Sequence, residues 1–275
     1  MPVLDIDRII STSPPQFNGV QFASKPAALR QLLVAEEILT QMTTKEATIG
    51  IDVGSKYADL TKILGAYNLR CMRLDVEFRD RHGEFVLGNA GFMPFRDESL
   101  DYVVLSHVLA HIEDLTTFLS EIERILKPGG MVFILQSNRY GWWKFWGYYL
   151  RRNDRRAHWR TFDFWGIHNT LATHRLKISK MHAPYHFYLH AKHSDFFYWL
   201  DRRLEGKVPN LFALQWLITA CRVSPGEGQM NFRREPNLLI RSLVTSVALV
   251  QALTLKAAEL GLRLISRSSG DNETT

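Results

Sequence analysis

Short apolar runs alternate with helix-length segments between residues 47 and 137, and this alternation constrains the fold more than any other feature. The runs have strand length and apolar interiors, and they span residues 47–53, 69–75, 84–88, 101–106 and 130–137. Strands that alternate with helices form a parallel sheet with right-handed crossovers. The pattern therefore predicts an α/β fold that binds ligands outside the carboxyl ends of its strands.

Further elements extend this unit on both sides. The segment 114–126 is an amphipathic helix that Asp114 can cap, and Lys127-Pro-Gly-Gly can stop it. Shorter helices are expected over 57–64, 162–176 and 194–204, and two more strands over 178–188 and 211–222. At the N-terminus, Pro26 favours the first turn of a helix that runs to Gln41, after an irregular stretch.

The tail consists of a linker over 224–237 and an apolar helix over 238–265. Only 14 uncharged residues lie between Arg241 and Lys256, fewer than the ~20 that span a bilayer. Such a helix buries its surface against the domain, another subunit or a membrane surface. We expect an N-terminal segment and cap helix (1–45), a central domain (46–223) and a linker with the apolar helix (224–275).

Composition narrows the class of protein. The two cysteines, Cys71 and Cys221, exclude a disulfide framework and a Cys-x-x-Cys zinc pair. The first residues have neither a basic start nor a long apolar run, so no signal peptide is expected. These features favour the cytoplasm. The formal charge of +6 favours anionic partners only weakly.

One longer stretch points to a family. It begins at Gly88 and reads GNAGFMPFRDESLDYVVLSHVLAHIED, and Leu126-Lys-Pro-Gly-Gly follows it. This combination resembles the class I S-adenosylmethionine-dependent methyltransferases, most closely their small-molecule branch, and the resemblance covers about 47–222. It implies a Rossmann-like seven-stranded mixed sheet with the last strand antiparallel and helices on both faces. It also implies that S-adenosylmethionine binds over the first four strands.

The resemblance places the cofactor's methionine end at the loop after the first strand, with Asp52, Gly54 and Ser55. A glycine there lets backbone N–H groups approach the ligand. The second and third glycines of the family are replaced here by Lys56 and Ala58. Lys56 either pairs with the cofactor carboxylate or points to water in a loop that no longer binds well.

Three further positions carry over to the nucleoside end of the cofactor. Asp75 ends the second strand, where a carboxylate can accept both ribose hydroxyls, and Glu77 is the alternative acceptor. Asn89 stands where the family commonly has Asp, and its amide oxygen can accept from the adenine amino group. Ala90 contributes a backbone N–H. The competing interpretations are an ordinary strand-end aspartate and a turn asparagine.

Ser106 and His107 follow the fourth strand, near the expected place of the transferred methyl group. His107 is the candidate catalytic residue, which orients the substrate or takes its proton; a packing or capping histidine is the alternative. His107 and His111 are four residues apart and are expected on one helical face. His-Glu-x-x-His is absent from that pair, so we interpret His111 as structural.

His182, His186 and His190 recur every four residues, as metal ligands often do. Neither cysteine nor an acidic residue lies among them, so we expect a substrate pocket there and no metal site.

A lid over 138–165 is rich in aromatic and basic residues, especially from 140 to 160. Such a segment packs on its own core, contacts a membrane surface or stacks on single-stranded nucleic acid.

The lid and the apolar tail (238–265) together favour methyl transfer to a small, apolar or lipid-like acceptor, in the cytoplasm or peripherally at a membrane. The alternatives are an inactive methyltransferase-like binding or scaffold protein and, with less support, a nucleic-acid methyltransferase. The sequence is also compatible with a homo-oligomer.

Overall fold

The computed structural model describes residues 4–12, 15–22, 24–42, 48–55, 59–78, 83–141, 162–183, 203, 213–225 and 233–270. Its elements follow in chain order: α1 (Ile6–Ser11), β1 (Gln16–Phe17), β2 (Val20–Gln21), α2 (Lys25–Met42), β3 (Ile49–Val53), α3 (Asp59–Gly65), β4 (Arg70–Asp75), β5 (Phe85–Leu87), β6 (Leu100–Ser106), the 3-10 turn η1 (Leu109–His111), α4 (Leu115–Ile125), β7 (Leu126–Ser137), α6 (Phe164–Ala172), β8 (Leu176–His182), β9 (Gln215–Arg222) and α8 (Leu238–Gly270).

A seven-stranded sheet forms the centre of the molecule, in the order β5-β4-β3-β6-β7-β9-β8. The first five strands in this order are parallel, and β9 runs antiparallel to both of its neighbours. Each predicted strand is present, and the prediction of a mixed sheet with an antiparallel last strand is confirmed. The strand order reverses between β3 and β6, where an open α/β sheet forms its ligand crevice.

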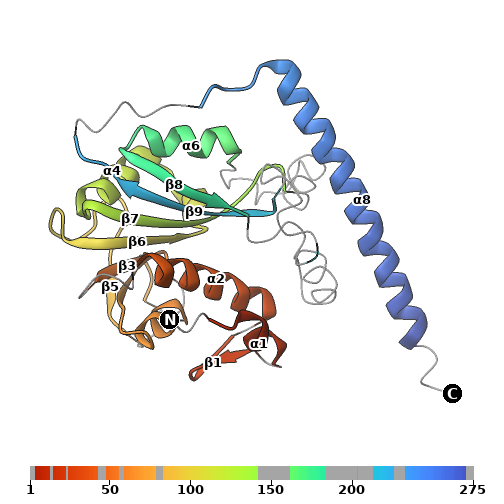
Figure 1. Cartoon of the computed structure of the whole chain (residues 1–275), viewed down its shortest axis with the longest axis horizontal. Coiled ribbons are helices and arrows are strands. Elements are labelled where there is room, and N and C mark those ends of the chain that lie inside the picture. The colour runs from red at the N-terminus through yellow and green to blue at the C-terminus, as the bar shows by residue number, and fades with distance from the viewer. Residues whose placement is uncertain are drawn as a thin grey trace.

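Helices cover both faces of the sheet, as predicted (Figure 1). On one face α4 and α6 bury apolar side chains against the sheet, and on the other α1, α2 and α3 do so. The helical period explains α4, since Phe118, Leu119, Ile122 and Ile125 are all fully buried. Asp114 caps this helix by accepting the Thr117 backbone N–H at 3.0 Å.

The N-terminal segment differs in part from its prediction. The stretch expected to be irregular contains the helix α1 and the two-stranded hairpin of β1 and β2. Both are too short to leave a periodic signal in the sequence. The next helix, α2, forms as predicted, and its buried Glu37 ties it to the sheet: it accepts Lys180 Nζ at 2.6 Å and Thr219 Oγ1 at 3.0 Å.

The tail forms one long helix, α8, which begins at the predicted residue (Figure 1). Within it, Leu238–Ala258 is long and apolar enough to cross a membrane, by length and composition alone. The sequence analysis counted only the uncharged stretch and placed this helix below spanning length. Counting the flanking residues around Arg241 and Lys256 makes the difference.

Close packing in the sheet depends on Gly50, the second residue of β3. A Cβ built on Gly50 would lie 2.2 Å from the ring of Tyr102 on the neighbouring strand β6. The Tyr102 hydroxyl donates to the Arg70 carbonyl at 3.1 Å, so the ring is held over the glycine. This contact excludes any side chain at position 50.

We expect Gly50→Ala to lower the free energy of unfolding by about 2 kcal/mol, because the methyl group must displace a buried ring. Urea unfolding measures this change. Gly65→Ala is the matched control, since open space surrounds the Cβ position there, and its stability should be unchanged or higher by up to about 1 kcal/mol. Equal stability of the two variants would contradict the packing argument.

Candidate cofactor and active site

The chain turns sharply at Gly54, directly after β3. Its φ is +70°, in the left-handed region, and its N–H donates to the Leu74 carbonyl at 2.7 Å. A Cβ on Gly54 would lie 2.6 Å from a methyl group of Val108. Both the backbone conformation and the available space therefore require glycine at this predicted position.

Asp52 lies in β3 beside this turn and is almost completely buried, as is Ser55. Burial raises the pKa of Asp52 from 3.8 to about 7, although a hydrogen bond with Ser55 and the charge of the buried Arg73 oppose the shift. Arg73 is the direct partner of Asp52 in the neighbouring strand β4. Asp52 and Ser55, both predicted to bind the cofactor, are thus hydrogen-bonded to each other beside the turn. Lys56 and Ala58 lie outside the described residues.

Asp75 ends β4, next to the Gly54 turn, as predicted. One of its oxygens, Oδ1, accepts the Glu77 backbone N–H at 3.1 Å, which closes a tight turn after the strand. A carboxylate has further lone pairs, so Asp75 can still accept from hydroxyl groups. Asp75 is half-buried, whereas Glu77 is exposed.

Asn89 and Ala90 follow β5, one strand further along the same edge. The Asn89 side-chain oxygen accepts the Gly91 N–H at 2.8 Å, so Asn89 also orders its own loop. Its amide is exposed and keeps both N–H donors and a second lone pair. The turn interpretation and the ligand interpretation are therefore compatible at this residue.

Exposed apolar side chains surround these polar residues, and the sequence analysis did not identify them. Val76 and Phe78 follow β4, and Leu87 and Phe92 lie at the end of β5 and in the loop after it. Each exposes more than half of its surface. Phe78 packs edge-on against Phe85, with ring centroids 5.1 Å apart. Such surfaces suit a flat heterocyclic ring.

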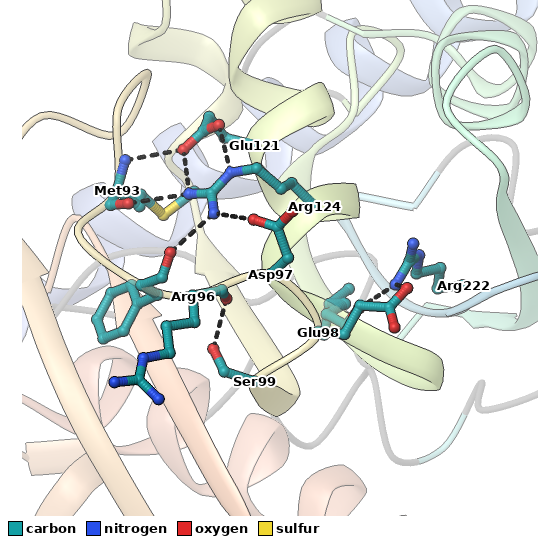
Figure 2. Close-up of polar contacts among 10 residues, drawn as sticks. Met93, Arg96, Asp97, Glu98, Ser99, Glu121, Arg124 and Arg222 are labelled. Atoms are coloured by element: carbon teal, nitrogen blue, oxygen red, sulfur yellow. Dashed lines mark hydrogen bonds and ion pairs between the residues drawn. The ribbon is translucent and has the colours of Figure 1, made fainter.

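Arg124, at the end of α4, holds the loop that carries Asn89 (Figure 2). Its guanidinium donates to the Met93 and Phe95 carbonyls at 3.0 and 2.7 Å and to Asp97 at 2.7 Å. Glu121 receives two hydrogen bonds from Arg124, both of 2.8 Å, and accepts the Met93 N–H. Its bond to Arg124 lowers the pKa of Glu121. These hydrogen bonds tie residues 93–97 of the loop to α4.

His107 follows β6 with a φ of +60°, which is unusual for a residue with a side chain. Ser137 Oγ lies 3.5 Å from its Nδ1, and Gln215 Nε2 lies 3.3 Å from its Nε2. The three residues come from the end of β6, the end of β7 and the start of β9. Strained residues held from several sides are typical of functional sites.

The structure also gives the positions of Ser106 and of the remaining histidines singled out in the sequence. Ser106 is half-buried at the end of β6, beside His107. The expectation that His107 and His111 share a helical face is wrong, because His107 precedes the 3-10 turn that His111 ends. His182 ends β8, while His186 and His190 lie outside the described residues. Among the residues that the structure describes, no group of three or more His, Cys, Asp or Glu side chains could hold a metal ion.

Two buried amides near His107 also escaped the sequence analysis. Asn138 is fully buried, donates to the Ala213 carbonyl at 2.8 Å and accepts the Tyr140 N–H at 3.0 Å. It thereby joins the end of β7 to the chain before β9. Gln136 is 2% exposed, and its side-chain oxygen has no hydrogen-bond partner in the described part of the chain. Alternation along β7 leaves no sequence signal for either role.

A cavity of about 520 Å³ lies at the opposite edge of the sheet. Glu98 precedes β6 there, and Arg222 ends the antiparallel strand β9. Its walls include paired charges: Arg222 with Glu98 at 3.0 Å (Figure 2), and Arg175 with Glu123. This cavity is therefore separate from the residues predicted to bind the cofactor.

Comparison with solved structures supports the fold. A methyltransferase from Archaeoglobus fulgidus that depends on S-adenosylmethionine matches with a TM-score of 0.51 and 14% identity, over 70% of this chain and 94% of that one. At this identity the similarity concerns the fold alone.

Sequence comparison identifies the domain. Residues 48–134 match the family described as "Methyltransferase domain". A demethylmenaquinone methyltransferase of Bacillus pumilus is 41% identical over 56 residues, which are 20% of this chain and 24% of that protein. One of Listeria welshimeri is 37% identical over 87 residues, covering 30% and 37%. Similarity to these curated relatives thus spans about a quarter to a third of their length.

The family match and the seven-stranded sheet agree. Residues 48–134 match a methyltransferase domain, and the sheet has the fold of methyltransferases of known structure that depend on S-adenosylmethionine.

The pKa of Asp52 leads to a pH-dependent stability. Because its folded-state pKa lies above the ordinary 3.8, folding takes up a proton, and stability falls as the pH rises from about 4 to about 7. We expect the wild type to lose on the order of 2 kcal/mol more than Asp52→Asn between about pH 5 and pH 8. Urea unfolding at both pH values measures this difference, and parallel losses in the two proteins would contradict it.

Proposed function

We propose that the protein transfers a methyl group from S-adenosylmethionine to a small, apolar acceptor. The observation that carries this proposal is the set of residues after successive strands at one edge of the sheet: Gly54, Asp75, Asn89 and His107. This edge adjoins the strand reversal, where ligands bind in open α/β sheets.

The described residues fit the cofactor. The positive φ of Gly54 turns the chain directly after β3, at the edge of the sheet where the ligand is expected. Asp75 accepts the ribose hydroxyls, and Asn89 with Ala90 meets the adenine edge. Val76, Phe78, Leu87 and Phe92 offer apolar surface to the ring. When bound, S-adenosylmethionine supplies an electrophilic methyl group on a sulfonium.

His107 is the residue that moves the proton in this proposal. The Gln215 amide donates to Nε2, which leaves the ring hydrogen on Nδ1, where Ser137 Oγ accepts it. The basic nitrogen is then Nε2. The acceptor atom of the substrate would displace the Gln215 amide from the Nε2 lone pair and pass its proton there. It would take the methyl group as the bond between that carbon and the sulfonium breaks, while Ser137 keeps the ring oriented.

An apolar acceptor is supported by two observations. The relatives of Bacillus and Listeria are named as demethylmenaquinone methyltransferases, although the matches are partial. The exposed apolar surface of α8 suits a protein that works beside lipid. We therefore also propose a cytoplasmic protein bound peripherally to a membrane. The lid segment 142–161 lies outside the described residues.

An inactive binding protein is the second candidate. Its motivation is the replacement of two family glycines by Lys56 and Ala58. It predicts cofactor binding without turnover on quinone or phenol acceptors, whereas the first proposal predicts both. A nucleic-acid methyltransferase would in addition bind RNA or DNA with an affinity that falls steeply with salt.

We expect Asp75→Ala to weaken S-adenosylmethionine binding about 10- to 100-fold, because each hydrogen bond to a charged acceptor contributes roughly 1.5–3 kcal/mol. Isothermal titration calorimetry measures the change. Glu77→Ala is the matched variant, two residues away, and should bind nearly as the wild type does. The reverse ranking would make Glu77 the ribose acceptor, and a wild type that binds no cofactor would remove the proposal.

His107→Asn separates chemistry from folding. Asparagine tolerates a positive φ, so the variant should unfold within about 0.5 kcal/mol of the wild type. We expect its kcat to fall at least about 100-fold with cofactor affinity unchanged, since the proton acceptor is lost. Unchanged turnover would assign His107 a packing role. The readout is the release of S-adenosylhomocysteine from S-adenosylmethionine in the presence of a demethylmenaquinone analogue.

A further inference from the structure

The outer surface of α8 is apolar and exposed. Leu239, Leu243, Val247, Val250 and Leu253 each leave at least about two-fifths of their surface uncovered. At 3.6 residues per turn these five project over an arc of roughly 120°. A contiguous apolar surface of this width is rare on a protein surrounded by water, and it marks an interaction site.

The opposite side of the same helix is already covered. Val244, Ala248, Ala252 and Leu255 recur every three or four residues, and each is buried by the rest of the chain. Asn169 of α6 exchanges two hydrogen bonds with the backbone of Arg233, at 3.0 and 3.2 Å, which fastens the segment just before α8 to the domain. The helix is therefore held lengthwise on the protein, with its apolar face outward.

Basic residues in α8 and in the segment directly before it favour contact with an anionic bilayer. The segment 233–270 contains six basic and two acidic residues, and Arg241 and Lys256 stand near the two ends of the apolar stretch. Basic residues that flank an apolar face bind lipid phosphates while their neighbours immerse. Thr245 and Thr254 donate to the Arg241 and Val250 carbonyls at 2.8 and 2.9 Å, so these hydroxyls need no water.

We propose that α8 lies in the plane of an anionic lipid bilayer, with its outer face immersed among the acyl chains. A spanning orientation would have to detach the four buried residues, and only about 23 Å of helix separates Arg241 from Lys256, short of the ~30 Å hydrocarbon core. Figure 1 shows α8 on the side of the molecule where β7 ends and β9 begins, which is the side of His107 and Gln215. The membrane surface therefore faces the end of the sheet that carries the candidate active site.

Flotation of the full chain with vesicles tests this assignment. The vesicles contain phosphatidylcholine alone or with added phosphatidylglycerol. We expect flotation with the anionic vesicles, and a bound fraction that decreases at high salt because the basic residues contribute. Leu243→Glu/Val250→Glu should lower the partition coefficient at least about tenfold, since it places two charges among the acyl chains.

Ala66→Glu is the control, because Ala66 is exposed and precedes β4, at the end of the sheet away from the candidate site. It should float as the wild type does. Equal flotation of the double variant and the wild type would overturn the proposal. So would a lipid-free dimer that the double variant dissociates, without flotation of the wild type, because a second copy would then cover the face. Resistance to alkaline extraction would indicate a spanning helix and overturn the in-plane orientation.

Titration of the lipid-free chain with S-adenosylmethionine tests the methyltransferase proposal separately. The double variant lies outside the candidate site and should bind the cofactor as the wild type does. Retained cofactor binding also shows that the variant is folded, so a loss of flotation then reports on the helix surface alone.

Discussion

The position of β3 between β4 and β6 is the constraint on which the rest of the site depends. Right-handed crossovers carry the chain from β3 outward to β4 and β5 in one direction and to β6 and β7 in the other. The helices that follow β3 and β6, α3 and α4, pack on opposite faces of the sheet. This opens a crevice between the carboxyl ends of the two strands. Gly54, Asp75, Asn89 and His107 each follow one of those strands. One topological feature thus gathers residues that are far apart in sequence.

Two buried carboxylates, Glu37 and Asp52, have pKa values shifted in opposite directions by their surroundings. Burial raises the pKa of both Glu37 and Asp52, but the hydrogen bonds from Lys180 and Thr219 outweigh it at Glu37, whose pKa is lowered. At Asp52 burial prevails, and the pKa rises to about 7. Glu37 therefore remains a fixed anion that holds α2 to the sheet. Asp52 lies beside the turn at Gly54 and has a pKa near neutral, so the charge next to this loop depends on the pH.

The sequence was informative where a candidate site residue ends or directly follows an apolar run. Gly54, Asp75 and His107 could be placed because strand ends are visible as breaks in that pattern. The partners that hold them could not: Gln215 lies 108 residues from His107 in the chain, and Arg124 holds Met93 from a separate helix. Such pairs depend on tertiary packing, which leaves no periodic signal. The α1 helix and the β1–β2 hairpin escaped prediction because they are shorter than the period that would reveal them.

The α8 helix shows where a local count is insufficient. Fourteen uncharged residues describe its sequence, but the bilayer interacts with a surface, and that surface depends on which side the domain covers. With Val244, Ala248 and Ala252 covered, the remaining apolar arc and the terminal basic residues fit an interface better than a span. An acceptor dissolved in the bilayer would then reach the edge at His107 by lateral diffusion. The proposed apolar substrate and the proposed membrane-bound state thus rest on the same distribution of exposed side chains.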